Sequence, residues 1–224
     1  MLRPLVSSIV DPGRNHLEAD FVSLLSSFLP EPAQAAELLA WSEALLESPG
    51  KKTALSDSAP GPELVNICGL PASGKSRQVQ RLAVSRPDHF LLSFDSLMEQ
   101  MPGYQADYRK NPAAAFKRWE RPARVLGYRL LTLAVERKRS LIFEHGNSPP
   151  QHVAVYQIMR YVYGYKIIIQ FINSPPELVG PRLPRRRRYL PPARVAERWA
   201  ALEKLLPAYR ALADEFTEIE GWKE

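Results

Sequence analysis

A glycine-rich segment at residues 69–76 has the spacing of a phosphate-binding loop. It reads Gly-Leu-Pro-Ala-Ser-Gly-Lys-Ser, which matches the pattern Gly-x-x-x-x-Gly-Lys-Ser, and it directly follows the apolar run 64–68. Glycines let the backbone wrap closely around phosphate oxygens, and the amide groups that open the following helix favour an anion. The order of strand, loop and helix favours nucleotide binding over a glycine-containing turn with an exposed lysine.

The residues of this loop have separate predicted roles toward ATP and Mg²⁺. Lys75 is expected to reach the β- and γ-phosphates, and the Ser76 hydroxyl is expected to bind the Mg²⁺ that bridges them. The nucleotide-binding residues are predicted to be Gly69, Leu70, Pro71, Ala72, Ser73, Gly74, Lys75 and Ser76. ATPases, GTPases and kinases share this loop, so it predicts nucleotide binding more firmly than it predicts a reaction.

Two carboxylates close apolar runs and could act beside the phosphates. Asp95 follows the run 90–94, and Glu144 follows the run 141–143. In an open parallel sheet, ligands bind beyond the carboxyl ends of the strands, so both side chains are expected at one site. Asp95 is the preferred base for a hydroxyl proton, and Glu144 is expected to orient substrate or metal-bound water. The alternative for Asp95 is a helix N-cap, because 96–99 resembles a first helical turn.

Further candidates for substrate contacts lie near these carboxylates. Tyr104, Tyr108 and Asn147 are polar or aromatic residues that could touch the acceptor, as could His145. Core or surface roles are the alternative for each of them.

An arginine cluster at 182–188 could close over a triphosphate. Arg182, Arg185 and Arg188 recur every three residues, which predicts that some of them point inward and stabilise the transferring phosphoryl group. A solvated charge run or a nucleic-acid contact is the alternative. The position of the cluster after a late strand candidate favours a lid, so nucleic acid is not the favoured partner.

The elements that must position these residues form an alternating pattern. Apolar runs at 64–68, 89–94, 141–143 and 166–172 alternate with helical patterns at 75–86, 112–138, 150–163 and 192–213, and 216–220 is a candidate edge strand. This alternation predicts an α/β fold, with a P-loop NTPase-type parallel sheet covered by helices on both faces. Two amphipathic helices near residues 17–28 and 38–45 precede a Ser/Pro/Gly-rich linker at 51–62. We therefore predict an N-terminal helical segment at 1–60 and a kinase domain at 61–224.

Composition limits the class of protein. The chain has 224 residues, a net charge of +6 and one cysteine, Cys68, which excludes an intramolecular disulfide and a cysteine-based zinc site. No standard signal peptide and no apolar run of membrane-spanning length are seen, so a soluble protein of the cytoplasm with no membrane partner is expected. The positive charge permits an anionic partner but does not identify one.

Several segments resemble the zeta toxin family of P-loop kinases. That family follows its phosphate loop with Asp-x-Phe-Arg and then Pro-x-Tyr or Pro-x-Phe, to which 95–104 is similar, although Leu97-Met98 replaces Phe-Arg. Glu144-His-Gly is similar to the family's Glu-Gly-Thr, but the threonine and arginine that follow the glutamate there are absent. The segment 188–191 resembles the family's lid arginine before a Pro-led helix. The similarity spans roughly residues 64–199.

This resemblance implies an ATP- and Mg²⁺-dependent kinase, in many members one that phosphorylates the 3′-hydroxyl of UDP-N-acetylglucosamine. It implies that Asp95 is the base and that Lys75, Arg182 or Arg185, and Arg188 contact phosphate. In some relatives a helical antitoxin blocks the nucleotide site, so the N-terminal helices are interpreted either as a cis inhibitor or as a structural extension.

The combined hypothesis is an ATP-dependent small-molecule kinase whose hydroxyl substrate could be a nucleotide sugar. Two alternatives remain open from the sequence. A polynucleotide 5′-kinase would use the same loop, base and lid, with binding that weakens steeply as salt increases. A non-catalytic nucleotide-dependent interaction module would bind ATP without forming a phosphorylated product.

Overall fold

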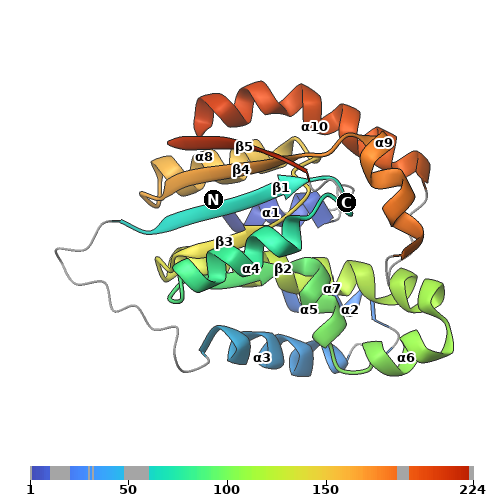
Figure 1. Ribbon diagram of the computed structural model, residues 1–224. Coiled ribbons are helices and arrows are strands. Elements are labelled where there is room, and N and C mark those ends of the chain that lie inside the picture. The colour runs from blue at the N-terminus through green and yellow to red at the C-terminus, as the bar shows by residue number, and fades with distance from the viewer. Residues whose placement is uncertain are drawn as a thin grey trace.

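The computed structural model contains a parallel five-stranded sheet between layers of helices (Figure 1). It describes residues 2–10, 21–29, 31, 33–47, 61–185 and 192–221. The sheet order is β2-β3-β1-β4-β5, so the strand that leads into the phosphate loop is central and the last strand is an edge. The strands are β1 (Glu63–Gly69), β2 (Phe90–Ser93), β3 (Leu141–Glu144), β4 (Lys166–Asn173) and β5 (Glu215–Glu220). The predicted parallel sheet is confirmed, including its late edge strand.

Helices cover both faces of this sheet. The helices are α1 (Leu2–Val10), α2 (Phe21–Ser26), α3 (Gln34–Glu47), α4 (Lys75–Ser85), α5 (Phe94–Gln100), α6 (Tyr104–Lys110), α7 (Pro112–Glu136), α8 (Gln151–Tyr161), α9 (Pro176–Val179), the 3-10 helix η1 (Gly180–Arg185) and α10 (Pro192–Leu212). Among the described residues, no helix is both long enough and apolar enough to cross a membrane.

Alternate side chains of β1 point to opposite faces of the sheet and pack against the two helical layers. Val65 and Ile67 pack with Leu82 of α4, whereas Leu64 and Cys68 pack in the larger core that α7, α8 and α10 complete. The side chains of these four β1 residues are all buried. A strand that is apolar on both faces requires helices on both sides, which is typical of a central parallel strand.

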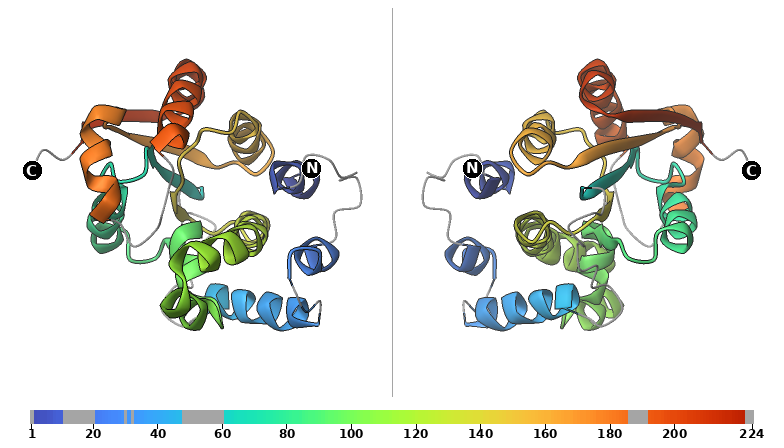
Figure 2. Two further views of the ribbon diagram at one scale, coloured as in Figure 1. Left: turned by 90° about the vertical axis from the view of Figure 1, so that its right-hand side faces the viewer. Right: turned by 90° about the vertical axis from the view of Figure 1, so that its left-hand side faces the viewer.

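The N-terminal helices pack on the outer side of α7 and α8, where Figure 2 shows them next to the main body. Leu25 and Leu46 are fully buried there, and Arg3 forms an ion pair with Glu136 at 2.8 Å. Arg129 pairs with a carboxylate of α3 as well. These three helices therefore share the core of the sheet domain.

The structure changes two expectations for this region. It contains three described helices where two were predicted, and the additional helix is α1 (Leu2–Val10). Of the helix expected near 17–28, the structure describes α2 (Phe21–Ser26), and residues 17–20 lie outside the described residues. Most of the predicted linker, 51–60, also lies outside them.

The transition from β2 to α5 differs by one residue from the prediction. β2 ends at Ser93, whose side chain accepts a hydrogen bond from the Ser96 backbone N–H and caps the helix. Asp95 therefore lies in the first turn of α5, and its alternative interpretation as the N-cap is wrong. Because the turn is immediate, Asp95 still lies at the carboxyl end of the sheet.

Candidate active site

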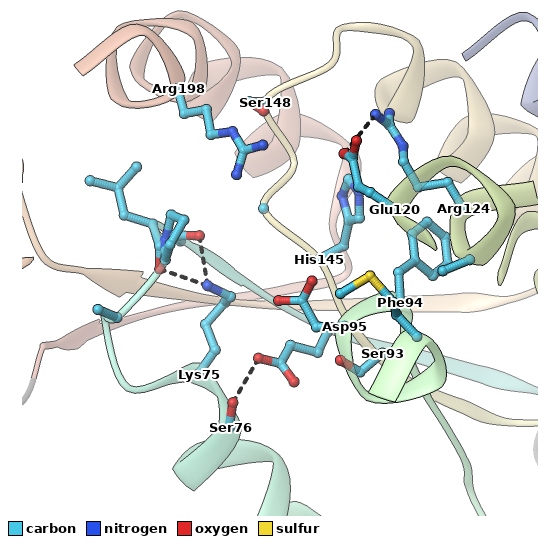
Figure 3. Close-up of a pocket in the computed structure, with 18 of the residues that line it drawn as sticks. Lys75, Ser76, Ser93, Phe94, Asp95, Glu120, Arg124, His145, Ser148 and Arg198 are labelled. Atoms are coloured by element: carbon cyan, nitrogen blue, oxygen red, sulfur yellow. Dashed lines mark hydrogen bonds and ion pairs between the residues drawn. The ribbon is translucent and has the colours of Figure 1, made fainter. Parts of the chain in front are cut away.

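A cavity of about 410 Å³ lies at the carboxyl ends of β1, β2 and β3 (Figure 3). The phosphate loop forms one side. The other side is formed by α5, α7, the end of β3 with the loop that follows it, and α10. These elements contribute Phe94, Asp95, Met98, Phe116, Glu120, Ala123, Arg124, Glu144, His145, Gly146, Ser148, Pro149 and Arg198. The volume lies within the range usual for small-molecule sites.

Backbone geometry gives the phosphate loop its shape. Gly69, Ala72 and Gly74 have φ of 141°, 65° and 101°. A Cβ on Gly69 would lie only 2.7 Å from the Ile172 carbonyl oxygen, so glycine is required there. Seven of the eight predicted nucleotide-binding residues line the cavity, whereas Ser73 is buried behind the loop.

Lys75 and Ser76 open α4 at the floor of the cavity. The Lys75 ammonium donates hydrogen bonds to the carbonyl oxygens of Gly69, at 3.0 Å, and Leu70, at 2.6 Å. The Ser76 hydroxyl donates to Glu144 Oε1 at 3.0 Å. The ammonium thus lies across the mouth of the loop, where a bound phosphate would offer it better partners.

The structure brings the two predicted carboxylates to one cavity. Glu144 is the last residue of β3 and contacts the P-loop serine, and Asp95 projects from the first turn of α5 (Figure 3). Parallel strands that end at one edge account for this convergence. A hydroxyl group between Lys75 and Asp95 could be oriented for attack on a phosphoryl group.

The predicted lid arginines are only partly described. Arg182 donates to the Ala72 carbonyl oxygen at 3.5 Å, so it touches the back of the phosphate loop but does not line the cavity. The backbone of Arg185 belongs to η1, whereas its side chain and all of Arg188 lie outside the described residues. The roles of Arg185 and Arg188 remain predictions.

Two cavity arginines were not predicted. Arg198 comes from α10 and Arg124 from α7, where Arg124 pairs with Glu120 at 3.6 Å (Figure 3). Single charges inside long helical patterns gave no signal for Arg198. The Glu120–Arg124 spacing of four residues on one helix was a weak signal, because such pairs are usual on exposed faces.

Tyr104 and Asn147, two of the predicted substrate contacts, lie outside the cavity lining. Tyr104 is 2% exposed and packs near the ring of Tyr108, with 5.7 Å between centroids. Asn147 is 0% exposed and forms hydrogen bonds with protein groups. Neither residue lines the cavity, because both side chains point into the core.

Two stacked imidazoles support the loop after β3. The rings of His145 and His152 are 4.0 Å apart between centroids and nearly parallel, at 7°. His152 Nε2 lies 2.7 Å from the Tyr128 hydroxyl. Burial, with the charge of Arg124 as a smaller contribution, lowers the pKa of His152 to about 3. Burial, His152 and Arg124 together hold the pKa of His145 well below its ordinary value.

Acid is expected to destabilise the protein through His152. Its pKa in the folded protein, about 3, is below the ordinary 6.5, so the unfolded chain binds the proton first. Stability is unaffected above about pH 6.5, and the free energy of unfolding falls by up to about 1.4 kcal/mol per unit as pH decreases toward 3. Urea unfolding at pH 7.5 and 5 measures this loss. His152→Gln should flatten the pH dependence, with His145 contributing the remainder, and an unchanged slope would contradict the prediction.

Gly127 is expected to control the position of a cavity wall. A Cβ at Gly127 would lie 2.2 Å from Cδ1 of Phe94, so Gly127→Ala must displace a ring that lines the cavity. We expect a loss of about 1–3 kcal/mol in the free energy of unfolding. Gly180→Ala is the matched control, because a Cβ at this position would have no described atom within 4 Å apart from those of its own chain neighbours. Denaturant unfolding of both variants checks the prediction, which fails if Gly127→Ala is as stable as the control.

The parallel sheet and the glycine-rich loop define a P-loop nucleotide-binding domain. Residues 64–206 match the family model described as an AAA domain. The chain belongs to this AAA domain family. No curated protein sequence matches it.

Solved structures with a similar fold include a chain from the PezAT chromosomal toxin-antitoxin system of Streptococcus pneumoniae. That chain is 16% identical, with a TM-score of 0.60, and the match covers 83% of this chain and 76% of that chain. A candidate kinase from Chloroflexus aurantiacus is 15% identical, with a TM-score of 0.48 and coverage of 73% and 87%. The PezAT match agrees with the fold implied by the resemblance to the zeta toxin family.

Proposed function

We propose that the chain is an ATP-dependent kinase that transfers the γ-phosphate of ATP to a hydroxyl group of a small molecule. The observation that carries this proposal is the convergence of the loop residues Lys75 and Ser76 with Asp95 and Glu144 at one cavity. A bond forms between the acceptor oxygen and the γ-phosphorus, and the bond to the ADP oxygen breaks. Asp95 takes the acceptor proton.

Positioning and charge carry this mechanism. Lys75 exchanges the carbonyl oxygens of Gly69 and Leu70 for phosphate oxygens, and Arg198 faces the cavity from the opposite wall. Both cations offset negative charge on the transferring group. The lid arginines 182, 185 and 188 add to this charge in the proposal.

The described residues fit a magnesium ion that arrives with the nucleotide. Ser76 would hold it, and Glu144, 3.0 Å from the Ser76 hydroxyl, would orient its water ligands. Bound Mg²⁺ supplies charge neutralisation for the β- and γ-phosphates. The described part of the chain holds no cluster of three His, Cys, Asp or Glu side chains for a metal. An ion whose other ligands are phosphate and water does not require one.

The finer assignments rest on the resemblance to zeta toxins. A nucleotide sugar such as UDP-N-acetylglucosamine is the first acceptor to test, an antitoxin is a candidate partner, and the cytoplasm is the proposed compartment. We assign residues 1–60 to an N-terminal segment and 61–224 to the kinase domain. Since no described residue of α1–α3 lines the cavity, the structural-extension interpretation of this segment is favoured over direct cis inhibition.

Label transfer from γ-labelled ATP tests the proposal. Nucleotide sugars, nucleosides and 5′-hydroxyl oligonucleotides serve as acceptors, with Mg²⁺ or with EDTA. Mg²⁺-dependent label in a small molecule supports the kinase. Label confined to oligonucleotides, with binding that weakens steeply in salt, favours a polynucleotide kinase. ATP binding without any labelled product favours the interaction module.

A further inference from the structure

His145 lines the side of the cavity that faces the phosphate loop. It follows Glu144 directly, and Figure 3 shows its ring between Asp95 and the Glu120–Arg124 pair. The ring of Phe94 packs against it edge-on, with 5.4 Å between centroids. The mechanism proposed above gives His145 no role, although it lines the same cavity as Asp95 and Glu144.

Backbone geometry sets the tautomer of His145. The Asn147 backbone N–H donates to His145 Nδ1 at 3.0 Å, so Nδ1 must carry a lone pair and the neutral ring carries its proton on Nε2. Asn147 Oδ1 lies farther from Nδ1, at 3.4 Å, and it already accepts a hydrogen bond from the Tyr156 hydroxyl at 3.0 Å. The shorter backbone bond therefore decides the tautomer.

Asn147 is held rigidly enough to impose this choice. Its φ is 54°, in the left-handed region, and its side-chain amide donates to Asn66 Oδ1 of β1 at 2.6 Å. The Tyr209 hydroxyl of α10 donates to the Asn147 carbonyl oxygen at 3.0 Å. Together with Tyr156 of α8, these bonds tie one loop residue to three elements. A fully satisfied buried network of this kind fixes orientation.

The other nitrogen of His145 faces the open side. Within the described part of the chain, Nε2 has no hydrogen-bond partner. It is nevertheless not among the buried side-chain atoms without a partner, so Nε2 is not fully buried. Because the residue lines the cavity, solvent or a ligand reaches Nε2 there. The stack on His152 at 4.0 Å fixes the plane of the ring.

We propose that His145 is a substrate-binding residue whose Nε2–H donates a hydrogen bond to an oxygen atom of the acceptor, and that Asn147 is the positioning residue that sets this donor. This inference rests on the proposed kinase function. It adds a chemical requirement for the acceptor: a second oxygen, such as a neighbouring hydroxyl, a ring oxygen or a carbonyl, close to the hydroxyl that is phosphorylated. A neutral donor suits such an uncharged oxygen.

Nitrogen-15 NMR of the histidine side chains in the full chain tests the tautomer without any ligand. The chain has four histidines, and the His145 signals are assigned by their loss in His145→Gln. His89→Gln is the control, because His89 contacts Glu63 away from the cavity. We expect the His145 proton on Nε2 at neutral pH. A proton on Nδ1 overturns the inference.

Acceptor kinetics test the substrate contact. The probe is the compound that the wild-type protein labels most efficiently from γ-labelled ATP. His145→Leu removes the donor and should raise the acceptor KM about 10- to 100-fold, with ATP affinity within about twofold of wild type. His145→Gln, which keeps an N–H donor, should lose less. An unchanged acceptor KM in His145→Leu overturns the contact. If no compound is labelled, the kinase proposal and the substrate role fail together, and the NMR result still decides the tautomer.

Discussion

Replacing Lys75 with alanine is expected to reduce phosphoryl transfer by about 10²- to 10³-fold. In the described structure its ammonium donates to the loop carbonyl oxygens of Gly69 and Leu70, and a bound triphosphate is a stronger partner for it than a neutral carbonyl oxygen. The loss should appear in ATP affinity as well as in rate, because the same charge contacts the ground-state phosphates. Single-turnover transfer and ATP titration measure the two effects.

Lys110→Ala is the matched control for this variant. Lys110 is an exposed residue at the end of α6 and does not line the cavity, so transfer and ATP affinity should match wild type. Lys75→Arg is also informative. The longer, planar guanidinium does not reproduce an ammonium that fits between two carbonyl oxygens. If Lys75→Ala kept wild-type transfer, the loop would not be the site of the reacting nucleotide.

The sequence predicted the sheet well because both of its signals are local. Each strand is a short apolar run, and the phosphate loop is a contiguous pattern whose glycines have a steric requirement that Gly69 displays against the Ile172 carbonyl oxygen. The convergence of Asp95 and Glu144 was also predictable. It follows from the rule that parallel strands end at one edge of the sheet.

The parts of the site that the sequence did not predict depend on contacts between residues that are distant in sequence. Arg124 and Arg198 reach the cavity because α7 and α10 pack against the sheet, and helical periodicity does not encode where on the sheet a helix packs. Asn147 looked like a polar loop residue, yet Asn66, 81 positions earlier, provides its partner in the core. Burial of that amide could not be seen without the β1–β3 pairing.

The short helices were missed for a different reason. α6 and α9 have 7 and 4 residues, too few to show a period of 3.6, and α1 has only 9. Such helices owe their stability to packing rather than to intrinsic propensity. α1 contacts α7 and α8, so its role becomes apparent only when the core is assembled.

Asp95→Asn is expected to lower the rate of phosphoryl transfer by about 10²- to 10⁴-fold while leaving ATP affinity nearly unchanged. Asparagine keeps the shape of the side chain and a hydrogen-bond acceptor for the hydroxyl, but it cannot take the proton. Asp95 comes from α5, whereas the phosphates are expected to contact the β1–α4 loop, so nucleotide binding should be spared. Rapid-quench transfer and ATP titration separate the two effects.

Asp88→Asn controls for the loss of one carboxylate, because Asp88 is exposed at the opposite end of β2. A large effect at Asp95 with none at Asp88 would identify proton transfer, rather than net charge, as the origin. Retained transfer in Asp95→Asn would move the role of base to Glu144. Glu144 would then contact the acceptor hydroxyl as well as Ser76. A loose transition state places little demand on the base itself. The size of the effect therefore reports how far the proposed transfer depends on orienting the acceptor hydroxyl.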